Sequence, residues 1–451
     1  MDSLPFEITV NTIEPRKTKL MLKCTGLLRE IPGKRRVYQG QLDGQNVIAK
    51  FFAGKFRASF QARKDWDGFK NLISRKLNSP ELCYYGYTED GCRCVITKQI
   101  LNCQTALELY QKDSNHQNRL NIIAMIAKEL AKLNNAGVFQ KDTHLGNFLI
   151  RNEDVFALDV GQMTFSSKAL SRNISLKQLA ALSAFFAPDG EDLLRLCREY
   201  AEIRNWDLNK TDLHAVKKCI AARRKKEIAR GLKKAVRTSK RYVKISEKGY
   251  KGVFDRKFYE SIEPLSFIRQ IDKLMSNGKI LKDGNTCYVS QIRFSGIELV
   301  IKRYNHKGFF HAIRNSIKGS RASKCWLNGH LLAMLNIPTP KPLAFFEQHE
   351  GLVIRQSYII TEYIDCPKLS EILRQPDTDT EKKQRLKKLA AVTVDKMHRN
   401  KITHGDLKHS NILIRENTAI VTDLDGMTVH CLKALFERKR KKDSASLKSI
   451  C

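Results

Sequence analysis

Two stretches of this sequence carry the same arrangement of groups that could do chemistry. In ITHGDLKHSNILI, residues 402–414, Asp406 is followed five residues later by Asn411, and Asp423 follows in IVTDLDGM. Transfer of a phosphoryl group from a nucleotide needs one carboxylate to orient and deprotonate the attacking hydroxyl. It also needs an amide oxygen and a second carboxylate to hold Mg²⁺ on the phosphates. Asp406 is therefore the candidate base, and Asn411 and Asp423 are the candidate metal ligands.

The second stretch, VFQKDTHLGNFLI at residues 138–150, repeats this arrangement. Together with the aspartate of FALDVGQM, its groups each precede their counterparts by 264 residues: they are Asp142, Asn147 and Asp159. Matches farther upstream keep the same order but drift to offsets of 260 and 252 residues, as loops of unequal length allow. Asp142 is thus a second candidate catalytic residue, and Asn147 and Asp159 are a second pair of candidate metal ligands. The repetition predicts a tandem duplication, with domains at residues 1–245 and 246–451.

Further candidate contacts lie on predicted strands and beside the candidate base. Lys50 in NVIAKFF and Lys302 in ELVIKRY each end a β-branched run that follows a glycine, so each is predicted on the second strand of a hairpin. A lysine there could bind the phosphate oxygens of ATP. Glu362, in the predicted strand IITEYI, is a further candidate for nucleotide binding. Lys408, two residues after Asp406, is predicted to stabilise the transferring phosphoryl group.

The elements that must position these groups are predicted in the same order in each half. Apolar residues at helical spacing predict a helix over Arg119–Leu133, and Gln384–His398 repeats it. Helical patterns also cover Ala62–Leu72 and Ala322–Leu335, whereas VITKQI and IITEYI indicate buried strands. Each half runs strands, helix, strands, helix, loop and hairpin, which predicts an α+β fold.

Composition limits the class of protein. A chain of 451 residues is too long for one ordinary core. No apolar run is long enough to span a bilayer, and the first residues do not have the pattern of a signal peptide. Twelve cysteines without an export signal favour free thiols in a reducing cytoplasm. Cys92 and Cys94 form the densest cysteine group with their neighbours, but a C-x-C pair is a poor match to zinc spacing.

The charge is strongly positive, at +34, with 81 Lys and Arg against 47 Asp and Glu. Fifteen cations and two acids lie in residues 217–251, and a second basic run covers residues 438–442. Apolar residues recur there at multiples of four and predict one helix face packed on the first domain: Val216, Ile220, Ile228, Leu232 and Val236. The basic side would face an anionic partner such as a membrane surface. No recognised nucleic-acid-binding module occurs, which disfavours a nucleic-acid partner.

HGDLKHSNILI followed by VTDLD resembles the catalytic and metal-binding loops of the protein kinase-like fold. With VIKRYN and SRASKCWLNGHLLAMLNIPTPKPLA, the second half looks like the bacterial lipopolysaccharide core kinases, the heptose and 3-deoxy-manno-octulosonic acid kinase family. The first half, with QKDTHLGNFLI, is similar to the same broad family. The resemblance extends from about Leu28 to Phe436.

This resemblance implies two tandem protein kinase-like bilobed domains that use ATP and Mg²⁺. The implied activity is phosphorylation of a sugar hydroxyl of the lipopolysaccharide inner core by a peripheral protein at the cytoplasmic face of the inner membrane. The implied partners are the core oligosaccharide or its lipid-linked precursor, and an anionic membrane surface. A kinase for proteins or small molecules, and a pseudokinase scaffold with one inactive half, are the alternatives.

The sequence departs from the usual kinase pattern in three places. Neither half has a clear glycine-rich phosphate loop. No acidic residue lies between residues 303 and 346, so Lys302 is predicted to lack the helix carboxylate that orients such a lysine, whereas Asp65 or Asp67 could serve Lys50. Gln140 stands where the second half has His404. The first half is therefore expected to bind Mg-ATP with weak catalysis or none.

Overall fold

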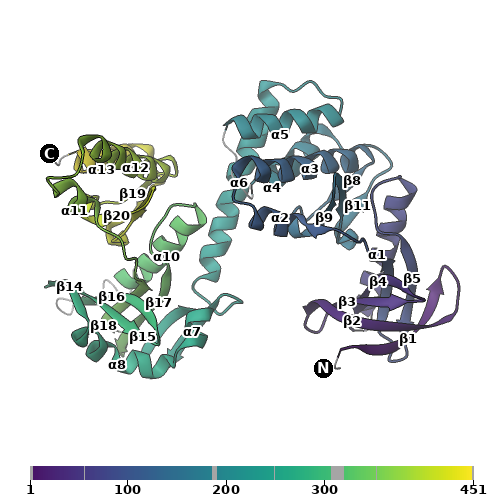
Figure 1. Cartoon of the computed structure of the whole chain (residues 1–451), viewed down its shortest axis with the longest axis horizontal. Helices are drawn as coiled ribbons and strands as arrows, with labels where there is room; N and C mark the ends of the chain where they lie inside the picture. Colours follow the sequence, from purple (N-terminus) through teal and green to yellow (C-terminus); the bar gives the residue numbers. More distant parts are fainter. Residues whose placement is uncertain are drawn as a thin grey trace. The chain divides into compact units, whose positions relative to one another are not determined.

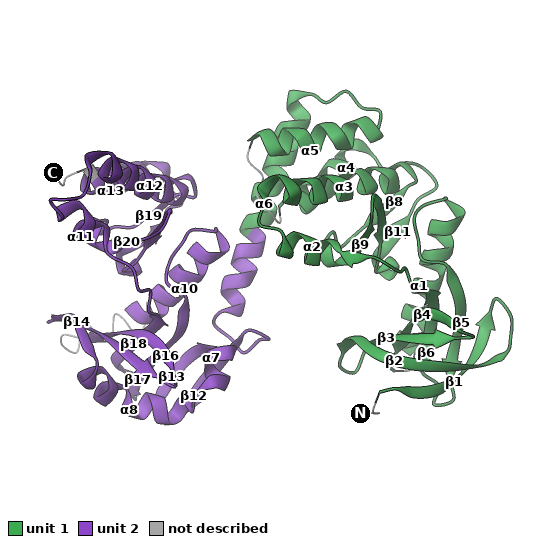
Figure 2. Ribbon diagram, viewed as in Figure 1, with its two compact units in different colours: residues 1–225 green, residues 226–451 purple. Residues whose placement is uncertain are grey.

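The computed structural model describes residues 4–54, 56–184, 190–247, 249–305, 319–351 and 353–448. The chain forms two compact units, residues 1–225 and 226–451 (Figure 2). The boundary lies inside helix α6 (Lys210–Lys234), ahead of the predicted boundary at residue 245. The reason is that the apolar residues of this helix serve two cores. Val216 and Ile220 are buried in the first unit, whereas Ile228 and Leu232 pack in the second.

The predicted helix from Val216 to Val236 is confirmed as far as Lys234, but its apolar face does not pack on the first unit alone. The helix ends at Lys234, and the rest of the basic run forms a hairpin of strands β12 (Tyr242–Glu247) and β13 (Tyr250–Asp255). Val236 lies beyond the helix and is exposed. In the described part of the chain, no helix combines the length and the apolar character needed to cross a bilayer.

The first unit begins with a closed six-stranded barrel (Figure 1). Around the barrel the order is β1 (Phe6–Glu14), β2 (Lys19–Ile31), β3 (Arg35–Leu42), β4 (Gln45–Phe52), β6 (Arg93–Lys98) and β5 (Leu82–Thr88). Helix α1 (Phe56–Ser74) connects β4 to β5 and packs on β4, β5 and β6. The predicted hairpin is confirmed as β3–β4, with Lys50 on its second strand.

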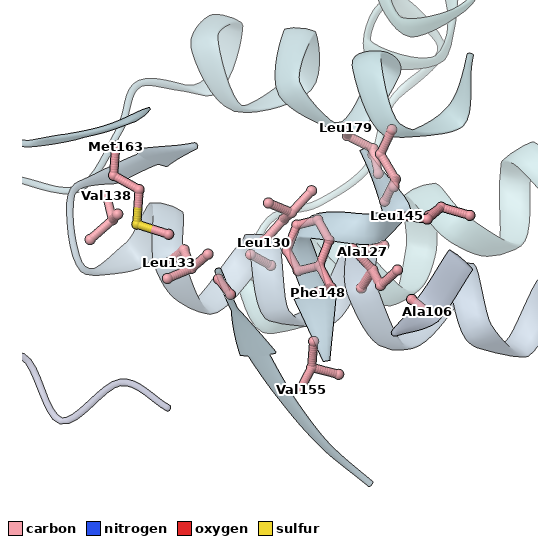
Figure 3. Close-up of a cluster of buried hydrophobic side chains, with 14 of the residues drawn as sticks. Ala106, Ala127, Leu130, Leu133, Val138, Leu145, Phe148, Val155, Met163 and Leu179 are labelled. Carbon is pink, nitrogen blue, oxygen red and sulfur yellow. The ribbon is translucent and has the colours of Figure 1, made fainter. Parts of the chain in front are cut away.

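The rest of the first unit is mainly helical and carries the candidate catalytic loop. In chain order it contains β7 (Gln104–Thr105), α2 (Ala106–Lys112), α3 (His116–Asn135), β8 (Val138–Gln140), η1 (Leu145–Asn147), β9 (Phe148–Arg151), β10 (Asp154–Ala157), η2 (Val160–Gln162), β11 (Met163–Phe165), α4 (Arg172–Ser183) and α5 (Gly190–Ile203). The predicted apolar stripe of α3 is confirmed as buried. In Figure 3, Leu130 of this stripe lies beside Phe148, which follows Asn147 in the chain. The core therefore fixes the strand that leaves the loop.

The second unit is built on a seven-stranded antiparallel sheet of order β12-β13-β17-β18-β16-β15-β14. Its further strands are β14 (Lys279–Gly284), β15 (Cys287–Phe294), β16 (Ile297–Asn305), β17 (Pro342–Glu350) and β18 (Val353–Glu362). Helices α7 (Arg256–Ser261) and α8 (Pro264–Asn277) contribute Phe258 and Phe267 to the core on one face. Helix α10 (Arg321–Met334) contributes Trp326 to the core on the other face. The predicted hairpin is β15–β16, and it carries Lys302.

The C-terminal part of the second unit holds the second loop. It contains α11 (Leu369–Arg374), α12 (Thr380–Arg399), β19 (Ile402–Thr403), η3 (His409–Asn411), β20 (Ile412–Arg415), β21 (Thr418–Val421), η4 (Leu424–Gly426), β22 (Thr428–Val429) and α13 (Lys433–Lys448). The four helices predicted in the two halves are all confirmed, with small shifts at their ends, as α1, α3, α10 and α12. The mixed helix and sheet content of the predicted fold class is confirmed.

Candidate active site

In the second unit, backbone and side-chain hydrogen bonds hold the candidate base loop against the candidate metal ligands. The Asn411 side-chain Nδ2 donates to the backbone oxygen of Asp406 (2.9 Å), and the backbone nitrogen of Thr422 donates to the oxygen of Asn411 (2.9 Å). Thr422 directly precedes Asp423, whose backbone is left-handed, with φ 57° and ψ 62°. Such a conformation costs free energy in a residue other than glycine, and it is frequent at functional sites. The predicted base and metal ligands therefore belong to one hydrogen-bonded assembly.

The side chain of Asp406 is exposed to solvent, which leaves it accessible to the hydroxyl group of a substrate. Its Oδ1 atom lies 2.8 Å from the Nζ atom of Lys408, which is also exposed. The hydrogen bond to Asp406 raises the pKa of Lys408, so the ammonium stays charged at neutral pH. The structure thus brings these two predicted residues together.

The first unit reproduces the loop contacts. Asn147 Nδ2 donates to the oxygen of Asp142 (3.1 Å), and the backbone nitrogen of Leu158 donates to the oxygen of Asn147 (2.7 Å). Asp159 is left-handed, with φ 56° and ψ 46°. Gln140 Nε2 donates to the oxygen of Leu158 (3.0 Å).

The second unit has the equivalent of that last contact, between His404 Nε2 and the oxygen of Thr422 (2.8 Å). Gln140 therefore replaces His404 as a structural support, and the loop of the first unit keeps its geometry. Two differences concern charged groups near the candidate catalytic residues. His144 stands where the second unit has Lys408, and Arg35 Nη1 lies 3.4 Å from Asp159 Oδ1.

The two candidate phosphate-binding lysines are both held by carboxylates. Lys50 Nζ donates to Asp65 Oδ2 (2.9 Å) on helix α1, as one of the two predicted alternatives requires, whereas Asp67 pairs with Arg63. Lys302 Nζ donates to Asp423 Oδ1 (2.5 Å) and to Asp425 Oδ2 (2.8 Å).

Helix α10 has no acidic residue, as predicted, but Lys302 nevertheless has two acidic partners. Its partners come from the loop after β21, far away in sequence, and not from helix α10. Because these partners lie more than 120 residues after Lys302, the helix that follows the lysine in sequence gives no sign of them.

Asp425, which sequence reasoning missed, is the centre of a partly buried network. Besides Lys302, its carboxylate accepts hydrogen bonds from Tyr304 and from Arg321 Nη2 (2.6 Å), and Cys325 Sγ lies 2.8 Å from Oδ1. Burial alone would raise the pKa of Asp425, but the neighbouring Lys302 ammonium and the hydrogen bonds from Cys325 and Tyr304 hold that pKa below its usual range. The carboxylate is thus charged, which suits the cations around it.

The charge of Lys302 is maintained in the same way. Burial alone would lower its pKa, but Asp425 and Asp423 raise it above its usual value. A charged ammonium at this place can bind a phosphate oxygen.

Asp443 on helix α13 is a second residue that sequence reasoning missed. Its side chain is 2% exposed, and it accepts hydrogen bonds from the backbone nitrogens of His404 (2.7 Å) and Gly405 (3.0 Å). Burial alone would raise its pKa, but the hydrogen bonds from His398 and from that backbone hold it below the usual range. These contacts fix the two residues before Asp406. The available signal was one acid directly after the basic run of residues 438–442.

Glu362 lies at the end of β18, where the sheet leads into the C-terminal part of the unit. Its Oε1 atom accepts a hydrogen bond from the backbone nitrogen of Lys341 (2.9 Å). This contact fixes the start of β17, so the described geometry gives Glu362 a structural task. Its role toward a nucleotide stays a prediction.

The second unit has suitable ligands for one magnesium ion on a nucleotide. The Nδ2 atom of Asn411 is used by the loop, which leaves its amide oxygen as a ligand, and Asp423 is partly exposed. Among the described residues there is no cluster of three His, Cys, Asp or Glu side chains that could hold a metal alone. Mg²⁺ bound through nucleotide phosphates needs only one or two protein carboxylates, so the residues present fit.

Comparisons with solved structures give only weak likenesses. A structure of WbdD is 10% identical, with 46% of this chain and 52% of that chain covered and a TM-score of 0.33. Vaccinia related kinase 3 is 12% identical, with 49% of this chain and 87% of that chain covered and a TM-score of 0.31. The PknI kinase domain of M. tuberculosis is 12% identical, with 44% and 96% covered and a TM-score of 0.30. The match spans about half the length of WbdD.

The comparison with family models is specific. No curated protein sequence matches the chain. Residues 277–449, which include Lys302, the candidate base loop and Asp443, match the family model described as the lipopolysaccharide kinase (Kdo/WaaP) family. This family implies the use of ATP and, typically, of a divalent metal. This match agrees with the resemblance drawn from the motifs of the second half, and it does not extend to the first half.

Proposed function

We propose that the second unit is a kinase-like domain that transfers the γ-phosphoryl group of ATP to a sugar hydroxyl of the lipopolysaccharide inner core. The observation that carries this proposal is the hydrogen-bonded assembly of Asp406, Asn411 and Asp423, with Lys302 on the same aspartate. The family of residues 277–449 supports the acceptor class.

In this proposal the acceptor hydroxyl oxygen attacks the γ-phosphorus, its proton passes to the carboxylate of Asp406, and ADP leaves. Asp406 orients the hydroxyl, and Lys408 lies close enough to the base to stabilise charge on the transferring group. Lys302 would bind the phosphates of ATP. Asn411 and Asp423 would hold Mg²⁺, which neutralises phosphate charge when it is bound.

The test is phosphate transfer by the purified chain to purified core oligosaccharide, with product mass measured by mass spectrometry. Asp406→Ala should lower the rate by on the order of 10²–10⁴-fold while the protein stays folded. Ser410→Ala, at an exposed position of the same loop, is the control and should leave the rate near that of the wild type. Unchanged turnover in Asp406→Ala would refute the role of the base. Transfer to a protein or a small soluble molecule, but not to the oligosaccharide, would favour the alternative kinase classes.

We further propose that the first unit is a duplicated kinase-like domain that binds Mg-ATP through Lys50, Asn147 and Asp159. The loop contacts repeated at an offset of 264 residues support this proposal. Weak catalysis or none is expected, because the counterpart of Lys408 is a histidine. Asp142 would be the base if catalysis occurs.

We also propose that the protein is peripheral at the cytoplasmic face of the inner membrane, attracted to its anionic surface. On and just after α6, the exposed cations include Lys217, Lys218, Lys225, Lys226, Arg230, Lys233, Lys234 and Arg237. Each cation near such a surface contributes about 1 kcal/mol, so a few of them would localise the chain. An anionic glycolipid acceptor at the same surface fits this charge.

A further inference from the structure

We propose that Asp425 is the positioning residue for Lys302. From the loop after β21, Asp425 holds Lys302 in the way that Asp65, on helix α1, holds Lys50 in the first unit. The inference rests on the proposed function, because it concerns how the phosphate-binding lysine is held. It identifies a carboxylate at a place where helix α10 offers none.

The two units exchange the carboxylate between two equivalent positions. At the offset of 260 residues that aligns α1 with α10, Asp65 corresponds to Cys325. At the offset of 264 residues that aligns the loops, Asp425 corresponds to Gly161. Each unit therefore has one aspartate and one small uncharged residue at this pair of positions, in opposite order.

The space around Gly161 shows why only one of the two positions can carry the aspartate. A Cβ atom added to Gly161 would lie 2.1 Å from Asp65 Oδ1, which is far inside van der Waals contact. The Asp65 carboxylate thus fills the space where a side chain at position 161 would begin. In the second unit the order is reversed, and the small Cys325 lies with its Sγ atom 2.8 Å from Asp425 Oδ1. Each unit therefore carries one carboxylate at this pair of positions: on the helix in the first unit and on the loop after the hairpin in the second.

Of the two carboxylates on Lys302, Asp425 is the one suited to orient the lysine. Asp423 is the more exposed, and it is needed as a metal ligand, so it must release Lys302 when Mg²⁺ binds. Asp425 is more deeply buried, and Tyr304, Arg321 and Cys325 hold it in place. A carboxylate fixed by several donors can keep the ammonium in position while the metal takes Asp423.

The experiment moves the carboxylate within the full chain. Three variants are compared with the wild type: Asp425→Gly, Cys325→Asp/Asp425→Gly and Asp425→Gly/Ala333→Asp. The second variant recreates the arrangement of the first unit. The third restores the same net charge at an exposed position of α10, away from the network, and is the matched control. The measurements are kcat and KM for ATP, the affinity for Mg-ATP by calorimetry, and thermal unfolding.

Asp425→Gly should lower kcat/KM for ATP by roughly 10²-fold, because a misplaced binding group costs about that much. Cys325→Asp/Asp425→Gly should recover at least about tenfold of this loss in kcat/KM and in Mg-ATP affinity. The Ala333 control should recover neither. Recovery by the relocated aspartate alone separates positioning of Lys302 from a purely structural role, because thermal stability alone would not follow this pattern.

The inference is overturned if the folded double variant binds Mg-ATP no better than Asp425→Gly, or if the Ala333 control recovers equally well. Should Asp425→Gly not fold, Asp425→Asn keeps the side-chain size and removes the charge. Wild-type affinity and kcat/KM in Asp425→Asn, within about twofold, would also overturn it. The Mg-ATP affinity needs no acceptor, so it tests the inference even if phosphate transfer to the core oligosaccharide is not observed.

Discussion

Asp443 should control both the stability and the turnover of the second unit, because it holds the backbone directly before the base. Two hydrogen bonds run from the backbone nitrogens of His404 and Gly405 to its buried carboxylate, at 2.7 and 3.0 Å. A hydrogen bond to a charged group contributes about 1.5–3 kcal/mol to stability. Asp443→Ala should therefore lower the free energy of unfolding of the second unit by about 3–6 kcal/mol, the sum over both bonds.

The effect on catalysis should fall on kcat and not on KM for ATP. Loss of the two hydrogen bonds lets the backbone before Asp406 move. A small displacement of the base from the acceptor hydroxyl should then lower kcat by roughly 10–100-fold. Lys302 and Asp423, which would contact the nucleotide, lie on other elements and keep their contacts. Asp443→Asn retains one acceptor oxygen, so both of its effects should be intermediate.

Hydrogen exchange measured by mass spectrometry reports directly on these bonds, because the amides of His404 and Gly405 should lose their protection in Asp443→Ala. Urea unfolding gives the free energy, and steady-state kinetics give kcat and KM. Lys442→Ala, which removes the exposed neighbouring side chain on α13, is the control and should change the free energy of unfolding by less than about 0.5 kcal/mol. Wild-type kcat together with lost amide protection would refute the positioning role.

Three further outcomes are expected. In the full chain with Asp423→Asn, residual Mg-ATP binding measured by calorimetry should come from the first unit, and an added Asp159→Asn substitution should remove it; persistent binding would contradict that site. Liposomes with anionic lipids should bind the protein at low salt and release it near 1 M salt, where the Debye length falls to about 3 Å, and neutral liposomes should bind poorly; binding that survives high salt would exclude the electrostatic attraction. Burial raises the pKa of Glu129 to about 7. The folded first unit then holds a proton that the unfolded chain releases, so its stability should fall as pH rises between about 4.5 and 7. Glu129→Gln should remove this dependence in urea titrations, and an unchanged slope would contradict it.

Local patterns predicted the elements that carry the site, because those patterns come from neighbours along one strand or helix. The stripe of α3 and the lysines on β4 and β16 follow from helical and strand periodicity. The loop residues followed from their repeated spacing. The same local reasoning failed for the run at residues 217–251, where a basic composition does not distinguish helix α6 from the hairpin that follows it.

The contacts that sequence reasoning missed join residues far apart in the chain. The partner of Lys302 lies 123 residues away at Asp425, and Asp443 lies 38 residues from Gly405. Nothing in the local pattern at either end marks such a pair, because the two ends share neither a strand nor a helix. For Asp425 a signal exists in the comparison of the two halves, where Gly161 and Cys325 are small at the positions that carry Asp425 and Asp65 in the other half.

The exchange between these positions also bears on how the two halves are related. The need to hold a charged lysine explains the carboxylate beside it in each unit, but it does not explain why a small residue stands opposite that carboxylate. In the first unit steric exclusion explains it, since the Asp65 carboxylate fills the space where a side chain at position 161 would begin. To move the carboxylate from the helix to the loop, the residues at both positions must be substituted. After the first substitution the lysine has neither the helix aspartate nor the loop aspartate as a partner. The carboxylate of Asp423, whose Oδ1 atom lies 2.5 Å from Lys302 Nζ in the second unit, would keep this lysine paired during that step. The arrangement of the second unit could thus arise from that of the first without loss of the charged lysine.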